Sequence, residues 1–307
     1  MGFLSRRLGL LGLTAVAACS PTDVSSNPQG TGGVVAAAGG ETTVIPAETG
    51  GAVGIGGAPA TGGVATGGAA GLDALTAQGE SCEHEWQLAV PGHYVRNNVW
   101  NTAAEGQTQC ILALGDPGRS YAGFELTDCG ISVGSSNPAS YPSVVKGWHY
   151  GLRTTSSGMP RQVSQVGSIP VEWTFTPPSG KYNVSFDIWF HPQQDVSSPD
   201  GGLEFMIWVS HGGGPMPAGA QVQPSATVEG ATWDINKGTV STWQYLAYVR
   251  NPTSASPFVA DIGNIIGNAV GQGHIDPNWY LLGIETGFEI WNCNGGGARS
   301  VIRIDVL

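Results

Sequence analysis

Residues 203–210 read LEFMIWVS, a run whose side chains alternate between the two faces of a β-strand. Leu203 and Phe205 point to one face, which is wholly apolar and is expected to pack into a core. Glu204 and Trp208 point to the other face. Because a carboxylate is costly to remove from water, we expect this second face to line a groove.

The same alternation recurs along the chain between clusters of Gly, Pro, Asn and Ser. The segments are VEWTFTPP, YNVSFDIWF, WQYLAYV, WYLLGIETGFEIW and SVIRIDVL. They predict an all-β fold, an antiparallel sandwich. One segment, SPFVADIGNIIGNAVGQG at residues 256–273, has helical spacing, and we expect a short helix on the outside of a sheet, with Ser256 as N-cap and Pro257 at the first position.

Composition limits the function. The 307 residues carry a net charge of −11 and include 10 Trp, all of them after Cys82. An acidic, aromatic-rich chain is not a basic nucleic-acid binder, and it favours a neutral partner. No spacing of His and Cys suggests a metal site, and no cofactor motif is convincing.

The N-terminal segment predicts export. Residues 1–18 have the charged, apolar and small-residue parts of a signal peptide. VAAC, ending at Cys19, resembles a bacterial lipobox, which predicts a lipidated Cys19 and a protein held at the cell envelope, at the outer membrane of a two-membrane bacterium. The alternative is ordinary cleavage and secretion. Residues 19–80 are rich in Gly, Ala and Thr and predict a flexible tether, which leaves residues 81–307 as one folded domain.

Four cysteines remain in the predicted domain. They are Cys82, Cys110, Cys129 and Cys293. An even number in an exported chain predicts two disulfides, although spacing alone does not reveal the pairing.

Two further strands place a carboxylate beside an aromatic residue. In FDIWF, Asp187 and Trp189 point away from the predicted core, and in GFEIWN, Glu289 and Trp291 share a face. Aromatic rings stack on sugar rings, and paired carboxyl groups cleave glycosidic bonds. A single carboxylate of this kind is usually only a solvated sheet position, but three such strands indicate a site.

These segments resemble glycoside hydrolase family 12 along nearly the whole domain. The matching segments are NNVW (97–100), TQCI (108–111), YPSVVKGWHYG (141–151), FDIW (186–189), EFMIW (204–208) and NWYLLGIETGFEIW (278–291). The resemblance implies a concanavalin A-like β-jelly roll and a retaining endo-β-1,4-glucanase that needs neither metal nor cofactor.

The resemblance also implies roles for individual residues. Glu204 is expected to be the nucleophile and Glu289 the general acid/base, with Asp187 hydrogen-bonded to the nucleophile. The implied sugar-binding residues are Asn98, Trp100, Met206, Trp208 and Trp291. Cys82 and Cys110 match a disulfide of the family, which leaves Cys129 and Cys293 as the second pair.

Three functions remain open at this stage. The first is hydrolysis of internal β-1,4 bonds in cellulose or mixed-linkage glucan, the second is a preference for xyloglucan, and the third is a non-catalytic carbohydrate-binding sandwich. Glu285 is a rival for the acid role, but its place outside the motif suggests a rim residue. The expected partner is the polysaccharide alone, bound by a monomer that touches the membrane only through its lipid.

Overall fold

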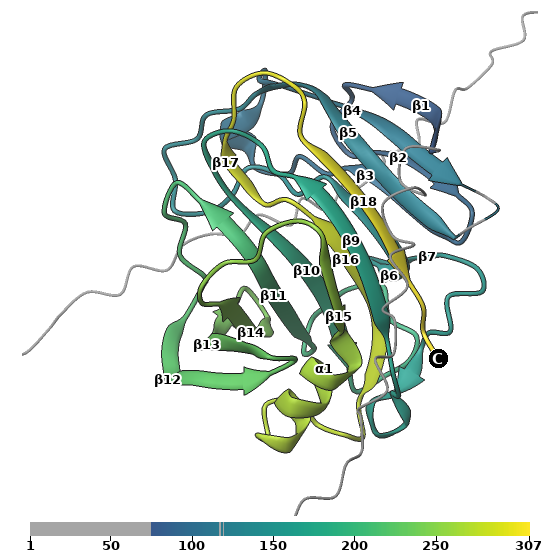
Figure 1. Ribbon diagram of the computed structural model, residues 1–307, viewed down its shortest axis with the longest axis vertical. Helices are drawn as coiled ribbons and strands as arrows, with labels where there is room; N and C mark the ends of the chain where they lie inside the picture. The colour runs from purple at the N-terminus through teal and green to yellow at the C-terminus, as the bar shows by residue number, and fades with distance from the viewer. Residues whose placement is uncertain (1–74, 117, 119) are drawn as a thin grey trace, which may run out of the picture.

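The computed structural model describes residues 75–116, 118 and 120–307. The predicted signal peptide, Cys19 and most of the predicted tether lie outside these residues. Two β-sheets stack face to face with one α-helix at an end of the sandwich (Figure 1). The prediction of an all-β sandwich with one short helix is confirmed.

The smaller sheet, called here the small sheet, has six strands. In spatial order they are β1 (Thr76–Ser81), β4 (Thr108–Asp116), β5 (Tyr121–Gly130), β18 (Arg299–Ile304), β9 (Pro170–Thr176) and β15 (Phe258–Asp261). All neighbouring strands in it are antiparallel.

The larger sheet, called here the large sheet, is twelve-stranded. Its main path is β12 (Ala220–Val228), β13 (Ala231–Val240), β14 (Trp243–Arg250), β11 (Leu203–Gly212), β10 (Lys181–His191), β16 (Tyr280–Gly287), β6 (Ser143–His149), β3 (His93–Asn97) and β2 (Trp86–Val90). Three short strands pair at its sides: β17 (Ile290–Asn292) with β10, β7 (Leu152–Arg153) with β6, and β8 (Arg161–Gln162) with β16. Two single-turn 3₁₀ helices, η2 (Thr102–Ala104) and η3 (Val163–Gln165), lie in the connections. The β11–β14 pair is parallel.

The core lies between the two sheets. On the large sheet Phe186, Ile188, Phe205 and Ile207 are fully buried, as their positions in the alternating pattern predict. From the small sheet Trp173 packs its ring edge against Phe186, with ring centroids 5.0 Å apart. Burial of these large apolar side chains is the main stabilising contribution, at roughly 1.5–3 kcal/mol for each.

The ordered fold begins earlier than the sequence suggested. Strand β1 lies inside the segment that was expected to be tether, and it pairs with β4 through partners such as Ala77 and Leu114. Its side chains are mostly exposed, so an edge strand of this kind has no alternating apolar pattern to reveal it. Backbone pairing places it, and the disulfide from Cys82 to Cys110 of β4 anchors the chain directly after it.

The helix α1 (Ile262–Gly271) is shorter than predicted. Ser256 is not its N-cap, because residues 258–261 pair with β9 instead, and Asp261 accepts the capping hydrogen bond from the Gly263 N–H at 2.9 Å. The helix extends the core beyond the small sheet. Its buried side chains join the main core, and Tyr248 of β14 donates a hydrogen bond to Asn268 (2.9 Å).

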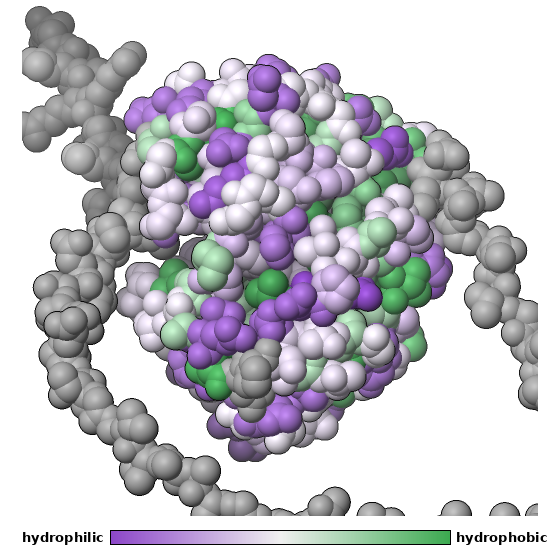
Figure 2. Space-filling model, turned by 60° about the vertical axis from the view of Figure 1, so that its left-hand side comes forward, coloured by the Kyte–Doolittle hydropathy of each residue, from purple (hydrophilic) through white to green (hydrophobic). Residues whose placement is uncertain are grey.

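Both predicted disulfides form, Cys82 with Cys110 and Cys129 with Cys293. The side of the molecule drawn in Figure 2 is a mosaic of polar residues and small apolar patches. Across the described residues, no helix combines the length and the apolar character that a membrane crossing requires.

Candidate active site

One face of the large sheet, turned away from the core, carries the predicted carboxylates; we call it the site face. Strand register brings them together, because directly paired residues of neighbouring strands share a face. Glu204 of β11 pairs with Trp189 of β10, and Asp187 pairs with Met206 on one side and with Glu285 of β16 on the other. The alternation read from the sequence therefore placed these side chains on the correct face.

Glu204 is half-buried and has one strong donor. The indole Nε1 of Trp243 donates to its Oε2 at 2.7 Å. Burial raises the pKa of Glu204 to about 7, the Trp243 hydrogen bond opposes that rise, and the charge of Glu285 adds to it. Glu204 is consequently a carboxyl group that ionises near neutral pH.

Glu289 lies just after β16 and is held by Asn183 of β10. The Asn183 side-chain amide donates to the Glu289 carboxylate, and the Glu289 backbone N–H donates back to Asn183 Oδ1 at 3.1 Å. Burial raises the pKa of Glu289 to about 8, and the charge of Glu204 raises it further, while the Asn183 hydrogen bond opposes the rise. Glu289 thus keeps its proton at a pH where Glu204 begins to lose its own.

Asp187 differs from the prediction in its contacts. It was expected to hydrogen-bond Glu204, but its Oδ1 is buried with no hydrogen-bond partner among the described residues. Burial raises the pKa of Asp187 well above its ordinary value, and three neighbouring carboxylates raise it further. They are Glu204, Glu285 and Glu289. Both effects favour the neutral, protonated form of Asp187.

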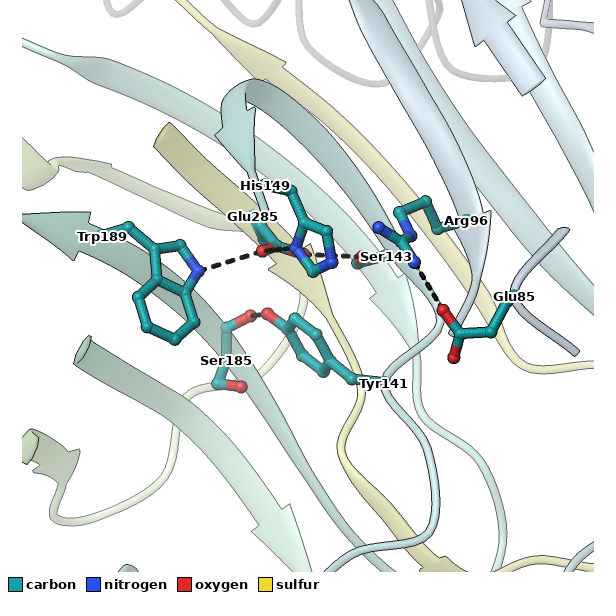
Figure 3. A network of polar contacts seen from close by, with 8 residues as sticks. All are labelled: Glu85, Arg96, Tyr141, Ser143, His149, Ser185, Trp189 and Glu285. Atoms are coloured by element: carbon teal, nitrogen blue, oxygen red, sulfur yellow. Dashed lines mark hydrogen bonds and ion pairs between the residues drawn. The ribbon is translucent and has the colours of Figure 1, made fainter. Parts of the chain in front are cut away.

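Glu285 is not the rim residue that the sequence suggested. It is 1 % exposed and accepts hydrogen bonds from Trp189 Nε1 (3.1 Å), Ser143 Oγ (3.1 Å) and His149 Nδ1 (Figure 3). Burial raises its pKa, but the attraction and hydrogen bond of His149, the charge of Arg96 and the hydrogen bond of Trp189 together outweigh burial, and the net shift is downward. A buried ionised carboxylate with every oxygen engaged has no proton to give, so Glu285 is a poor candidate for the acid role.

Three of the predicted sugar-binding residues, two tryptophans and a methionine, are covered in this structure. Trp208 is 1 % exposed, and Met206 and Trp291 are each 2 % exposed. The Trp208 indole donates to the Met206 sulfur (3.4 Å), and the Trp291 indole donates to the Ser136 carbonyl (2.7 Å). They form a packed layer beneath the surface.

Asn98 and Trp100 lie in the segment after β3 and are half-buried. The Asn98 carbonyl accepts from the Tyr141 N–H (2.7 Å), and the Trp100 N–H donates to the Ala139 carbonyl (3.2 Å). Ser140 bridges to both Val99 and Ile290, so the segment of Ser140 lies between this segment and the one that carries Glu289.

Two functional contacts were missed by sequence reasoning. Trp243 reaches Glu204 because β14 lies parallel to β11. This pairing joins segments far apart in the chain, so no local sequence pattern predicts it. Asn183 did carry a signal, since it has the same parity as Asp187 along β10 and so points to the same face. Within the described part of the chain, no group of three or more His, Cys, Asp or Glu residues could hold a metal ion.

Comparison with known proteins agrees with this geometry. Residues 91–302 match Glycosyl hydrolase family 12. The chain is 28 % identical over 250 residues to Endoglucanase S of Pectobacterium parmentieri, covering 76 % of this chain and 90 % of the relative. It is 25 % identical over 212 residues to Xyloglucan-specific endo-beta-1,4-glucanase A of Aspergillus niger, covering 67 % and 81 % respectively.

Among solved structures, the endoglucanase Cel12A from Rhodothermus marinus superposes with a TM-score of 0.67 at 34 % identity. That alignment covers 75 % of this chain and all of the other. Residues 91–302, which match the family, include the site-bearing strands of the large sheet together with Glu204 and Glu289. The chain therefore belongs to glycosyl hydrolase family 12.

Proposed function

We propose that the protein is a retaining endo-β-1,4-glucanase in which Glu204 is the nucleophile and Glu289 the general acid/base. The observation that carries the proposal is that two half-buried carboxyl groups lie on one face, close enough for the charge of Glu204 to raise the pKa of Glu289. A neighbouring negative charge favours the protonated form of Glu289 once Glu204 is ionised, as the two roles require. The endoglucanase relatives support the same activity.

The reaction is a double displacement. A Glu204 carboxylate oxygen forms a bond to the anomeric carbon as the glycosidic C–O bond breaks, and the proton of Glu289 passes to the departing oxygen. The Glu289 carboxylate then takes a proton from water, whose oxygen displaces Glu204 from the sugar. The product has the stereochemistry of the substrate, and both side chains return to their starting protonation states.

Asp187 is proposed to support the nucleophile as a neutral acid. It occupies the site face two register pairs from Glu204 and has an unsatisfied Oδ1. A protonated carboxyl group can donate a hydrogen bond to a neighbouring carboxylate, which stabilises the ionised form of that neighbour.

The sugar-binding assignments also remain proposals. Asn98 and Trp100 are half-buried, and only the segment of Ser140 separates them from the segment of Glu289, which supports a site for sugars on one side of the cleavage point. Met206, Trp208 and Trp291 are covered, so we propose that they shape the groove from beneath. Binding of a polysaccharide to such a surface requires no metal or cofactor.

The decisive experiment measures hydrolysis by wild type and by Glu204→Gly on barley β-glucan, carboxymethylcellulose and xyloglucan. We expect wild type to release reducing ends and Glu204→Gly to lose turnover by about 10⁴-fold or more, because the covalent step disappears. Sodium azide should then restore cleavage of an activated aryl cellobioside and give the inverted glycosyl azide. Glu125→Gln on the small sheet is the matched control and should keep wild-type activity.

Failure of wild type to cleave any of the three glucans, with binding retained, would support the non-catalytic alternative. Xyloglucan is a second candidate substrate because one relative is named as xyloglucan-specific. The ratio of the three initial rates separates the two preferences. An active Glu204→Gly variant would overturn the nucleophile assignment.

We further propose that the protein is exported, lipidated at Cys19 and active as a monomer at the cell envelope. The leader sequence and two disulfides support export, because such bonds persist in oxidising compartments. Metabolic labelling with a palmitate analogue should mark wild type and spare Cys19→Ala. Equal labelling of the two proteins would contradict lipidation at this residue.

A further inference from the structure

The carboxylate of Glu285 is fixed in one orientation inside the site face. Three donors hold it: Trp189 and His149 on Oε1, and Ser143 on Oε2 (Figure 3). The donors come from β10 and β6, the two strands that flank β16. Three donors therefore fix the position and the charge of a buried side chain that does not contact the substrate in the proposed mechanism. The role of this fixed carboxylate is the question that the following observations address.

One connection runs through aromatic rings toward Glu204. Trp189, held by Glu285, packs edge-on against Trp243 with ring centroids 5.9 Å apart. Trp243 in turn donates the 2.7 Å hydrogen bond to Glu204. Both indoles belong to one buried cluster, so a shift of the first ring must displace the second. The orientation of the N–H that reaches Glu204 therefore depends on Glu285.

A second connection is electrostatic. Glu285 pairs directly with Asp187 in the strand register, and its negative charge raises the pKa of both Asp187 and Glu204. The pKa of Glu289 is raised by burial and by the charge of Glu204, and it is lowered by the Asn183 hydrogen bond. We therefore expect the charge of Glu285 to act mainly on Asp187 and Glu204.

The ionisable groups that interact with Glu285 come from several neighbouring segments. They are His149 on β6, Arg96 on β3 with its partner Glu85, Asp187 on β10, Glu204 on β11 and Tyr141 before β6. His149 supplies the nearest contact, and Arg96 lowers the pKa of Glu285 from farther away. Both favour the ionised form of Glu285.

We propose that the His149–Glu285 pair is a positioning unit for the nucleophile, acting through the ring of Trp189 and through the fixed negative charge of Glu285. This inference rests on the assignment of Glu204 as nucleophile in the proposed function. The pair neither touches the reacting atoms nor transfers a proton. It holds the donor to Glu204 in place and keeps Asp187 neutral, so that Asp187 can donate to Glu204.

The test is the pH dependence of kcat/KM for Glu285→Gln on barley β-glucan. Glutamine keeps the shape and can still accept hydrogen bonds, but it removes the charge. Since a like charge no longer opposes ionisation of Glu204, its pKa should fall. The acidic limb of the plot of kcat/KM against pH, which reports that ionisation, should therefore move to lower pH by about half a unit or more. The basic limb, set by Glu289, should stay in place, and kcat/KM at the optimum should fall about tenfold.

The matched control is Glu125→Gln, which removes one negative charge from the small sheet. Its two limbs should coincide with those of wild type. If the limbs of Glu285→Gln stay in place, or both move together, the charge role is overturned. A loss of activity without any change of the acidic limb would indicate a purely structural residue.

Trp189→Phe tests the link through the aromatic rings independently, and it remains a test of the proposal if Glu285→Gln does not fold. It keeps the charge of Glu285 and an aromatic ring but removes the N–H donor. We expect kcat to fall about threefold to tenfold with KM unchanged, since the effect is on the nucleophile and not on binding. Unchanged kcat in this variant would overturn the proposed link through the rings.

The outcomes also separate this inference from the proposed function. The role of Glu285 is contradicted if wild type is active, azide rescues Glu204→Gly, and the pH profile of Glu285→Gln equals that of wild type. The proposed function is contradicted if wild type is inactive or if Glu204→Gly keeps full activity, and neither result involves Glu285.

Discussion

The site face holds carboxylates in two opposite environments, that of Glu285 in β16 and that shared by Glu204 in β11 and Glu289 after β16. Glu285, next to β6, accepts three hydrogen bonds, and its pKa is lowered although it is 1 % exposed. Glu204 and Glu289 each have one side-chain donor, and burial raises their pKa values to about 7 and about 8. Burial alone does not set the charge of a carboxylate. The donors around it decide, and they are abundant where a charge is fixed and sparse where a proton must move.

The largest expected effect comes from removing the proton donor. Glu289→Gln should lower kcat on barley β-glucan by roughly 10²–10⁴-fold, because a poor leaving group needs general acid catalysis. An aryl cellobioside with a strongly acidic phenol needs little protonation, so its bond-breaking step should be much less affected. Burst and steady-state kinetics on both substrates measure the difference. Equal losses on the two substrates would contradict the acid role.

The next effect concerns the donor to Glu204. Trp243→Phe removes the N–H that favours the ionised form, so the pKa of Glu204 should rise above about 7. The nucleophile must be ionised, and the acidic limb of kcat/KM against pH should move to higher pH, opposite to the shift expected for Glu285→Gln. We expect about tenfold lower activity at the optimum. An acidic limb that stays in place would remove Trp243 from this role.

A matched change on the other side of the pair is Asn183→Ala. It removes the amide that lowers the pKa of Glu289, so that pKa should rise above about 8 and the basic limb should move to higher pH. The acidic limb should stay where it is in wild type. Measurement of kcat/KM over the full pH range, with circular dichroism to confirm folding, tests the contact between Asn183 and Glu289. Movement of the acidic limb instead would exchange the two assignments.

The smallest effect is on stability. Glu289 ionises near 4.5 in the unfolded chain and near 8 in the folded protein. Between these pH values the unfolded state releases a proton that the folded state keeps, so the free energy of unfolding falls as pH rises. Glu289→Gln cannot titrate, and its Tm should exceed that of wild type at pH 8 by about 2–4 °C for each kcal/mol gained, with a smaller gain at pH 5. Scanning calorimetry at both pH values measures it, and an equal difference at the two values would count against a raised pKa.

Much of the site was open to sequence reasoning because strand parity is a local property. The alternation in FDIWF and EFMIW placed Asp187 and Glu204 on the face opposite the core, and the cysteine count predicted two disulfides. The predicted start of the helix was wrong, because pairing of residues 258–261 with β9 overrides the local N-cap signal at Ser256. Strand β1 was not predicted, because an exposed edge strand needs no apolar alternation.

The sequence by itself determined the all-β class, the parity of each strand and the residues able to do chemistry, since each depends on spacing along one segment. Only the tertiary structure decided which carboxylate is charged. Glu285 and Glu289 lie four residues apart in the same segment and look alike in the sequence. Their donors, His149 and Asn183, come from different strands, and the fold alone sets which donors reach which carboxylate.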